Sequence, residues 1–247
     1  MVRWLAQLGY AWRRHGPIGL FWLIGYNIAY YVSRRGRNAA VEQQMDAFDS
    51  KYGTDTASYR DIRGLDVVTL PAARYAGRYE PSSAELVRSE LDRLDIDPER
   101  FTFIDFGSGK GRALLVAAGF PFKEVVGVEF SRELHKIAKK NIALLPPETT
   151  RAGALRSVHG DATVFELPQS DLVCYLYNPF GPPVITAVAE KLADHHKDYG
   201  YRIIIIYHDP RHRDVFERTG KFDVLDQTSG TLILTTVQKS QDQVSRC

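Results

Sequence analysis

The sequence predicts an α/β protein built on a doubly wound, mostly parallel sheet of seven strands that ends in an antiparallel C-terminal hairpin. Short runs rich in β-branched and aromatic residues alternate with helical stretches between residues 101 and 238. The run Ile203–Ile206 is apolar without interruption, which is typical of a parallel strand covered by helices on both faces. The last two runs are joined by Asp226–Thr231, which is too short for a parallel crossover, so these strands should pair antiparallel.

The elements are expected in the following order. Ser82 and Glu85 have the spacing of a capping box and open an amphipathic helix that ends before Asp97-Pro98. Strands are expected at Phe101–Phe106, Glu124–Phe130, Leu155–His159, Asp171–Tyr177, Tyr201–Tyr207, Phe222–Leu225 and Leu232–Gln238. Helices are expected near Arg112–Gly119, Arg132–Leu145, Pro183–His195 and Pro210–Thr219.

Composition excludes several classes of protein. Of 247 residues, 44% are hydrophobic and 25% are charged, which is ordinary for a globular chain and excludes disorder and collagen. Two cysteines, one of them the last residue, are too few for a disulfide scaffold or a zinc cage. We therefore expect a cytoplasmic protein without a bound metal.

The N-terminal segment differs from the rest of the chain. Residues 1–40 hold six arginines and no acidic residue, a charge of +6, so the net charge of +2 leaves −4 for the remainder. Their uncharged run Pro17–Val32 would span about 24 Å as a helix, short of a bilayer core of about 30 Å. Aromatic residues and flanking arginines suit a peripheral anchor on the cytoplasmic face of a membrane. Packing on the body or on a second subunit, and a targeting segment, are the alternatives.

The domain organisation follows from these patterns. Residues 1–40 form the basic, aromatic, apolar segment, and residues 41–80 form a linker with a short helix near Val41–Ser50. Residues 81–240 form the α/β domain, and residues 241–247 form a polar tail.

Three segments at successive strand ends carry the candidate chemistry, because open α/β sheets bind ligands beyond the carboxyl ends of their strands. The first is the glycine-rich turn Asp105–Gly111, whose glycines let a ligand approach the backbone. It lacks the spacing of a phosphate loop and reads GxGxG where a dinucleotide fingerprint has GxGxxG. The second is Glu129, where a carboxylate can accept hydrogen bonds from ribose hydroxyls, and the third is Asp161, which can accept from an adenine amino group.

Together, DFGSGKG, GVEFS and GDA, in this order, resemble the class I, seven-strand methyltransferases that use S-adenosylmethionine, over about residues 80–238. The resemblance implies this cofactor for the chain. It implies that the first turn lines the methionine moiety, that Glu129 holds the ribose, and that the segment after the third strand faces the adenine. The cofactor-binding residues implied by matching position are Tyr79, Asp105, Gly107, Ser108, Gly109, Gly111, Glu129, Phe130, Asp161 and Ala162.

The acceptor side is expected after the fourth strand. Asn178, Pro179 and Phe180 stand where amino-directed relatives carry [DN]-P-P-[YF], with one proline fewer here. In that interpretation Asn178 accepts hydrogens from the target nitrogen and Phe180 stacks beside it, whereas a plain strand-to-helix turn is the alternative. Tyr79 and Pro81 match the Y-x-P-[ST] cofactor lid of lysine-directed members.

The expected function is therefore methyl transfer to nitrogen, with a protein lysine slightly favoured, because the lid and the apolar front resemble a membrane-associated protein-lysine methyltransferase group. A small amine or a nucleic-acid base is the alternative acceptor, and the −4 body argues against duplex nucleic acid. A nicotinamide-dependent oxidoreductase and a non-catalytic cofactor-binding module remain further alternatives.

Overall fold

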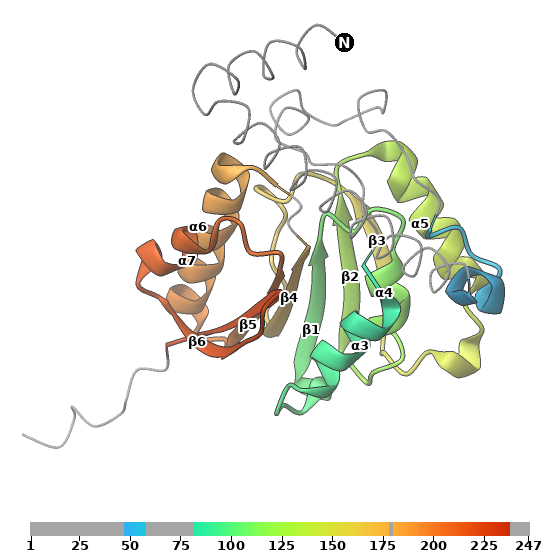
Figure 1. Ribbon diagram of the computed structural model, residues 1–247, viewed down its shortest axis with the longest axis horizontal. Coiled ribbons are helices and arrows are strands. Elements are labelled where there is room, and N and C mark those ends of the chain that lie inside the picture. The colour runs from blue at the N-terminus through green and yellow to red at the C-terminus, as the bar shows by residue number, and fades with distance from the viewer. Residues whose placement is uncertain (1–46, 58–81, 178–179, 238–247) are drawn as a thin grey trace, which may run out of the picture. The chain divides into compact units, whose positions relative to one another are not determined.

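The computed structural model describes residues 47–57, 82–177 and 180–237. The chain divides into two units, Met1–Asp46 and Ala47–Cys247, and all described residues belong to the second. They form a seven-stranded sheet in the order β3-β2-β1-β4-β5-β7-β6 (Figure 1). The strands are β1 (Phe101–Phe106), β2 (Glu124–Glu129), β3 (Leu155–His159), β4 (Asp171–Tyr177), β5 (Ile203–His208), β6 (Phe222–Gln227) and β7 (Thr231–Thr236).

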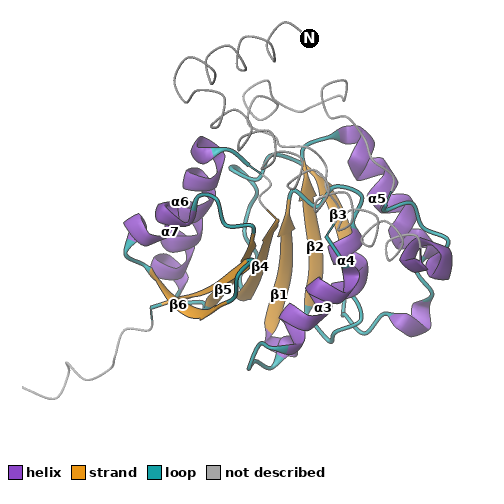
Figure 2. Ribbon diagram, viewed as in Figure 1, coloured by secondary structure: helices purple, strands orange, loops and turns teal. Residues whose placement is uncertain are grey.

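Helices precede β1 and connect the strands, except between β3 and β4 and between β6 and β7 (Figure 2). The first of them, α3, begins at the cap Ser83, whose hydroxyl accepts from the Leu86 amide, one residue later than the capping-box spacing predicts. Residues 47–52 are also helical. The helices are α3 (Ala84–Asp92), α4 (Arg112–Ala117), α5 (Arg132–Leu144), α6 (Pro182–Tyr199) and α7 (Arg213–Thr219), with short 3₁₀ turns η2 (Pro98–Arg100) and η3 (Pro147–Thr149).

The predicted α/β architecture is confirmed, with one feature that the pattern did not specify. Strands β1 to β5 pair in parallel, and β6 and β7 form the expected antiparallel hairpin. However, β7 also pairs antiparallel with β5 and so lies between β5 and β6. The register sets Thr231, the first residue of β7, opposite His208, the last residue of β5.

The sheet is covered on both faces because its central strands alternate their side chains between two apolar clusters. Ile104 and Ile205 face the cluster built with α6 and α7. Phe103 and Ile204 face the cluster built with α3 and α4. Figure 1 shows α6 and α7 on one side of the sheet and α3, α4 and α5 on the other. A parallel sheet buried in this way leaves its strand ends as the places where a ligand can bind.

Several expectations fall on residues outside the described ranges. These are the apolar run Pro17–Val32, most of the predicted linker and the C-terminal tail. Among the residues that the structure does describe, no helix combines the length and apolar character needed to span a bilayer.

Candidate functional site

The candidate site lies where the strand order reverses. β1 has β2 on one side and β4 on the other, so the chain leaves β1 toward one edge of the sheet and returns at β4 toward the other. Loops that follow such neighbouring strands separate, and ligands of open α/β sheets bind in the crevice between them. The glycine-rich turn follows β1 directly at this point.

The glycine-rich turn has backbone angles that residues with a side chain rarely adopt. Gly107, Gly109 and Gly111 have φ angles of 82°, 54° and 88°, all in the left-handed region. The amides of Gly107 and Ser108 both donate to the carbonyl of Val128, at 2.9 and 3.2 Å. The turn is therefore folded over the end of β2, where it meets the second predicted segment.

Glu129, the last residue of β2, is hydrogen-bonded to this turn through its carboxylate. Its side chain is 2% exposed, and its two carboxylate oxygens accept from the amides of Gly109 at 2.7 Å and Ser131 at 2.8 Å. Burial raises the pKa of Glu129 to about 7, although the backbone hydrogen bonds act in the opposite direction. Each oxygen has a second lone pair, so Glu129 keeps the capacity to accept from ribose hydroxyls as well.

Asp105, the first residue of the glycine-rich turn, still lies within β1 and is 5% exposed. Its pKa is raised to about 8, first by burial and then by the neighbouring charge of Glu129. Among the described residues, no hydrogen bond and no cation offsets this desolvation. A buried carboxyl group in this situation is stabilised as an anion only when a cation approaches it. The residues present therefore fit a ligand that carries an ammonium group, such as an amino-acid moiety.

The loop after β3 is fixed by a residue that the sequence did not suggest. Lys191, on α6, donates to the carbonyls of Ala162 and Phe165, the second at 2.9 Å. Burial lowers the pKa of its ammonium to about 8. Asp161 caps the same loop through the amide and hydroxyl of Thr163, both at 2.8 Å. The loop predicted to face the adenine is thus hydrogen-bonded to α6 through Lys191 and within itself through Asp161.

The two apolar residues expected near the adenine are buried. Phe130 is 8% exposed and Ala162 is 4% exposed. Ala162 belongs to the apolar cluster on the α6 side of the sheet, while Phe130 follows Glu129 in the chain. Their predicted contact with a cofactor stays a prediction.

The expected acceptor side is described only in part. Asn178, Pro179 and Tyr79 lie outside the described residues. Phe180 is 9% exposed and packs in the same cluster as Val184 and Ile185 of α6. Its predicted stacking against a target nitrogen stays a prediction.

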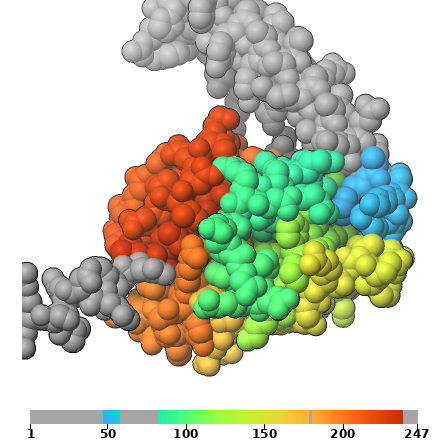
Figure 3. Space-filling model, turned by 90° about the horizontal axis from the view of Figure 1, so that it is seen from below, coloured from blue at the N-terminus to red at the C-terminus, as the bar shows by residue number. Residues whose placement is uncertain are grey.

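A segment that was expected to be mainly linker, residues 47–57, is bound to the back of the glycine-rich turn. Lys110 is fully buried, and its ammonium lies 2.8 Å from the Asp55 carboxylate. Arg112 donates to the Thr56 hydroxyl at 2.7 Å, and Asn141 donates to the carbonyls of Asp55 and Lys110 at 3.0 and 2.9 Å. In the space-filling view, residues 47–57 (blue) are part of the domain surface (Figure 3). The ammonium of Lys110 thus forms an internal ion pair that links the glycine-rich turn to residues 47–57.

Asp49 organises this segment, and its removal is expected to destabilise the domain. Its carboxylate accepts from the hydroxyls of Thr54 and Thr56, both at 2.7 Å, and from the amides of Thr56 and Ala57, at 2.9 and 2.7 Å. We expect Asp49→Ala to lower the free energy of unfolding by about 3 kcal/mol, because these donors lose their acceptor. Thermal unfolding should then begin roughly 6–12 °C lower, as circular dichroism would show.

A matched control is Asp92→Ala, which removes an exposed carboxylate at the end of α3. Its free energy of unfolding should stay within about 0.5 kcal/mol of wild type. Equal stability of the two variants would show that the network around Asp49 does not hold the segment.

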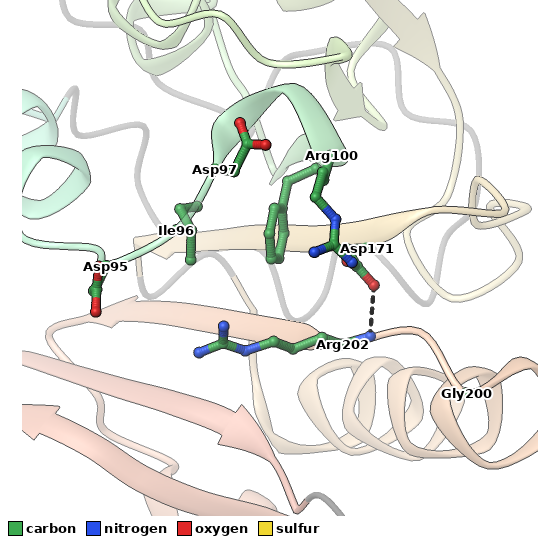
Figure 4. Close-up of a pocket in the computed structure, with 8 residues that line it drawn as sticks. Asp95, Ile96, Asp97, Arg100, Asp171, Gly200 and Arg202 are labelled. Atoms are coloured by element: carbon green, nitrogen blue, oxygen red, sulfur yellow. Dashed lines mark hydrogen bonds and ion pairs between the residues drawn. The ribbon is translucent and has the colours of Figure 1, made fainter.

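A cavity of about 360 Å³ lies at the opposite ends of the strands. It is formed at the amino ends of β1, β4 and β5, where the Arg202 amide donates to Asp171 at 2.9 Å (Figure 4). Ligands of parallel sheets bind at the carboxyl ends, so this cavity is separate from the candidate site. Within the described ranges, no group of three or more His, Cys, Asp or Glu side chains is placed to hold a metal ion.

Comparison with known proteins finds similarity of fold. No protein-family model and no curated protein sequence matches the chain. Among solved structures, a ribosomal protein L11 methylase from Lactobacillus delbrueckii subsp. bulgaricus is 15% identical, with 66% of this chain and 81% of that chain covered and a TM-score of 0.47. An RNA methyltransferase from Salinibacter ruber in complex with S-adenosyl-L-homocysteine is 20% identical, with 66% and 98% covered and a TM-score of 0.43.

The glycopeptide N-methyltransferase MtfA, complexed with S-adenosyl-L-methionine, is 11% identical, with 63% of this chain and 94% of that chain covered and a TM-score of 0.47. By their names, these three proteins act on different acceptors. The expectations of a lysine acceptor, of a membrane-associated group and of no nucleic-acid substrate therefore stay predictions.

Proposed function

We propose that this protein is an S-adenosylmethionine-dependent methyltransferase that acts on nitrogen, with the side chain of a protein lysine as the favoured acceptor. The observation that carries the proposal is the pair Asp105 and Glu129, two buried carboxyl groups that lie against a left-handed glycine turn at the reversal of strand order. Among the residues that the structure describes, no cation pairs with the buried Asp105, and Glu129 keeps acceptor capacity for hydroxyl groups.

Different residues would bind different parts of the cofactor. Asp105 and the turn Gly107–Gly111, with Ser108, would hold the methionine moiety, and Glu129 would accept from the ribose. Phe130, Asp161 and Ala162 would border the adenine, and Tyr79 would cover the cofactor as part of the lid. Lys191 would act indirectly, because it fixes the loop that carries Asp161 and Ala162.

S-adenosylmethionine supplies an activated methyl group, so the protein mainly aligns the acceptor and keeps its nitrogen uncharged. A lysine with an ordinary pKa near 10.4 is neutral in only about one molecule in 2,500 at pH 7, a deficit of roughly 4.6 kcal/mol. Asn178 and Phe180 would orient the nitrogen lone pair and exclude water from it, which reduces this deficit.

Binding of S-adenosylhomocysteine at pH 7 is expected to release about one proton. Asp105 is mostly protonated at this pH, because its pKa is about 8, and an approaching ammonium favours the carboxylate. Affinity should therefore rise as the pH increases toward 8. Titration calorimetry in phosphate and in Tris measures the release, because the apparent enthalpy then depends on the buffer's ionisation enthalpy. An enthalpy that is identical in the two buffers would contradict pairing of Asp105 with the ammonium.

The acceptor class is tested by methyl transfer from tritiated S-adenosylmethionine. Separate pools of lysate protein, RNA, DNA and small molecules are incubated with the full chain and with Asn178→Ala as the control. Label in protein, recovered as methyl-lysine after hydrolysis and lost with the variant, is the expected result. Label in RNA or DNA with none in protein would overturn the preference for lysine.

A further inference from the structure

Three side chains from separate elements meet at the carboxyl end of β5. They are Glu90 of α3, Thr231 at the start of β7 and His208 at the carboxyl end of β5. The Thr231 hydroxyl donates to Oε1 of Glu90, and Nδ1 of His208 lies 2.9 Å from the same hydroxyl oxygen. Nδ1 of His208 is 3.6 Å from Oε1 of Glu90. The insertion of β7 beside β5 creates this contact, since it sets Thr231 opposite His208.

The order of the hydrogen bonds determines where the imidazole carries its proton. The hydroxyl of Thr231 has a single proton, which it donates to Oε1 of Glu90. The hydroxyl oxygen can then only accept from His208, which places a proton on Nδ1. In the neutral imidazole, the lone pair is therefore on Nε2, the nitrogen on the far side of the ring from Thr231.

Glu90 is the acidic residue of this arrangement. It is 1% exposed, and among the described residues Oε2 has no hydrogen-bond partner. A buried carboxylate with only part of its hydrogen-bonding capacity used stabilises a positive charge nearby, and Nδ1 of His208 lies 3.6 Å from its Oε1 atom. Its field also reaches Tyr175, where burial first and Glu90 second raise the pKa of the phenol well above its ordinary value.

The position of His208 relates it to the acceptor side. Its ring lies 4.7 Å, centroid to centroid, from that of Tyr177, its partner in the β4–β5 register. Tyr177 directly precedes Asn178 in the chain. His208 is 18% exposed, so the imidazole is accessible although Glu90 is not. Asp209, the next residue in the chain, pairs with Arg211. Tyr175, two residues before Tyr177 in β4, donates its phenol hydrogen to Ser82.

We propose that His208 is a catalytic base that accepts the acceptor's proton at Nε2, and that Thr231 and Glu90 are positioning residues that set its tautomer and stabilise its imidazolium form. This inference rests on the proposed function and adds a residue to it. The acceptor ammonium transfers a proton to Nε2, and the freed nitrogen lone pair forms the bond to the methyl carbon. The sulfur–carbon bond breaks, its electron pair remains on sulfur, and the imidazolium returns its proton to water.

The tautomer can be measured without any acceptor. In the full chain labelled with ¹⁵N-histidine, two-bond ¹H–¹⁵N correlation spectra distinguish a protonated from an unprotonated ring nitrogen, and His208→Gln assigns the signal. We expect protonated Nδ1 and unprotonated Nε2 in wild type and in Thr231→Ser, which keeps the hydroxyl. Thr231→Val, of similar volume but without the hydroxyl, should lose this preference. A wild-type His208 protonated at Nε2 and not at Nδ1 would overturn the proposal.

The catalytic role is measured as transfer of tritiated methyl groups to poly-L-lysine. We expect kcat to fall about 100-fold in His208→Gln, within the range for general bases, and about 10-fold in Glu90→Gln and Thr231→Val. Thr231→Ser and the control His212→Gln should stay within about twofold of wild type.

Cofactor affinity tests the proposed function separately from the proposed role of His208. S-adenosylhomocysteine should bind all these variants within about twofold of wild type, because none of the three residues contacts the glycine-rich turn in the described structure. A wild-type kcat in His208→Gln would overturn the proposal for His208 and leave the proposed function intact. Failure of wild type itself to bind S-adenosylhomocysteine would instead contradict the proposed function.

Discussion

Replacing Glu129 by alanine is expected to weaken S-adenosylhomocysteine binding by about 100-fold or more. The substitution removes the acceptor of the Gly109 and Ser131 amides, and leaving a buried amide without a partner costs about 1–3 kcal/mol. It also removes the proposed ribose contact. The glycine-rich turn and the cofactor therefore lose the same support, and titration calorimetry measures the combined effect.

Glu124→Ala is the matched control for this prediction. Glu124 is at the other end of β2, where its carboxylate pairs with Arg156 at 2.5 Å on the surface. Affinity for S-adenosylhomocysteine should stay within about twofold of wild type in this variant. If Glu129→Ala, shown by circular dichroism to be folded, bound as tightly as Glu124→Ala, Glu129 would have no part in the cofactor site.

Replacing Gly127 by alanine is expected to lower the free energy of unfolding by about 3 kcal/mol and to disturb the glycine-rich turn. A Cβ at this position of β2 would lie 2.6 Å from Cδ1 of Leu114 and 2.6 Å from Oγ of Ser108. Both neighbours are buried, so the strand or the turn must move, at the upper end of the cost of overpacking. Because Ser108 is in the turn, affinity for S-adenosylhomocysteine should fall about 10-fold in the same variant.

The control for this substitution is Gly160→Ala. A Cβ at Gly160 would have its nearest neighbour, Cγ1 of Val158, at 4.0 Å, which is ordinary contact. Thermal unfolding of this variant should match wild type within about 2 °C. Equal melting temperatures for the two alanine variants would show that the close approach at Gly127 does not constrain the fold.

The fold could be predicted largely from the sequence because its signals are local. The strands at Phe101–Phe106, Leu155–His159 and Asp171–Tyr177 have the predicted bounds, since turn residues or charges interrupt the apolar runs there. Other ends differ by a few residues, and α6 continues to Tyr199, where Gly200 adopts the left-handed conformation that ends it. The position of β7 between β5 and β6 was not predicted, because strand order depends on pairing between distant segments.

The sequence predicts the glycines and the acidic residues of the candidate site. It does not predict the residues that hold them in place through contacts with distant parts of the chain. Asp105, Glu129 and the glycine turn follow from strand ends, and the structure brings them together. Lys191 contacts a loop 26 to 29 residues away, and Thr231 meets Glu90 across 141 residues. No sequence pattern indicates contacts between residues that are this far apart in the chain. Likewise, the polar composition of residues 47–57 resembles a linker, although Asp49 and Asp55 bind them to the domain.

Calorimetric titration of the full chain with S-adenosylhomocysteine shows whether the buried carboxyl groups beneath the glycine-rich turn form an S-adenosylmethionine site. We expect one site with a micromolar dissociation constant, and binding that is weakened by Glu129→Ala and not by Glu124→Ala. Absence of binding by folded wild-type protein, with heat of binding on titration of NADH instead, would contradict it and favour a nicotinamide-dependent enzyme.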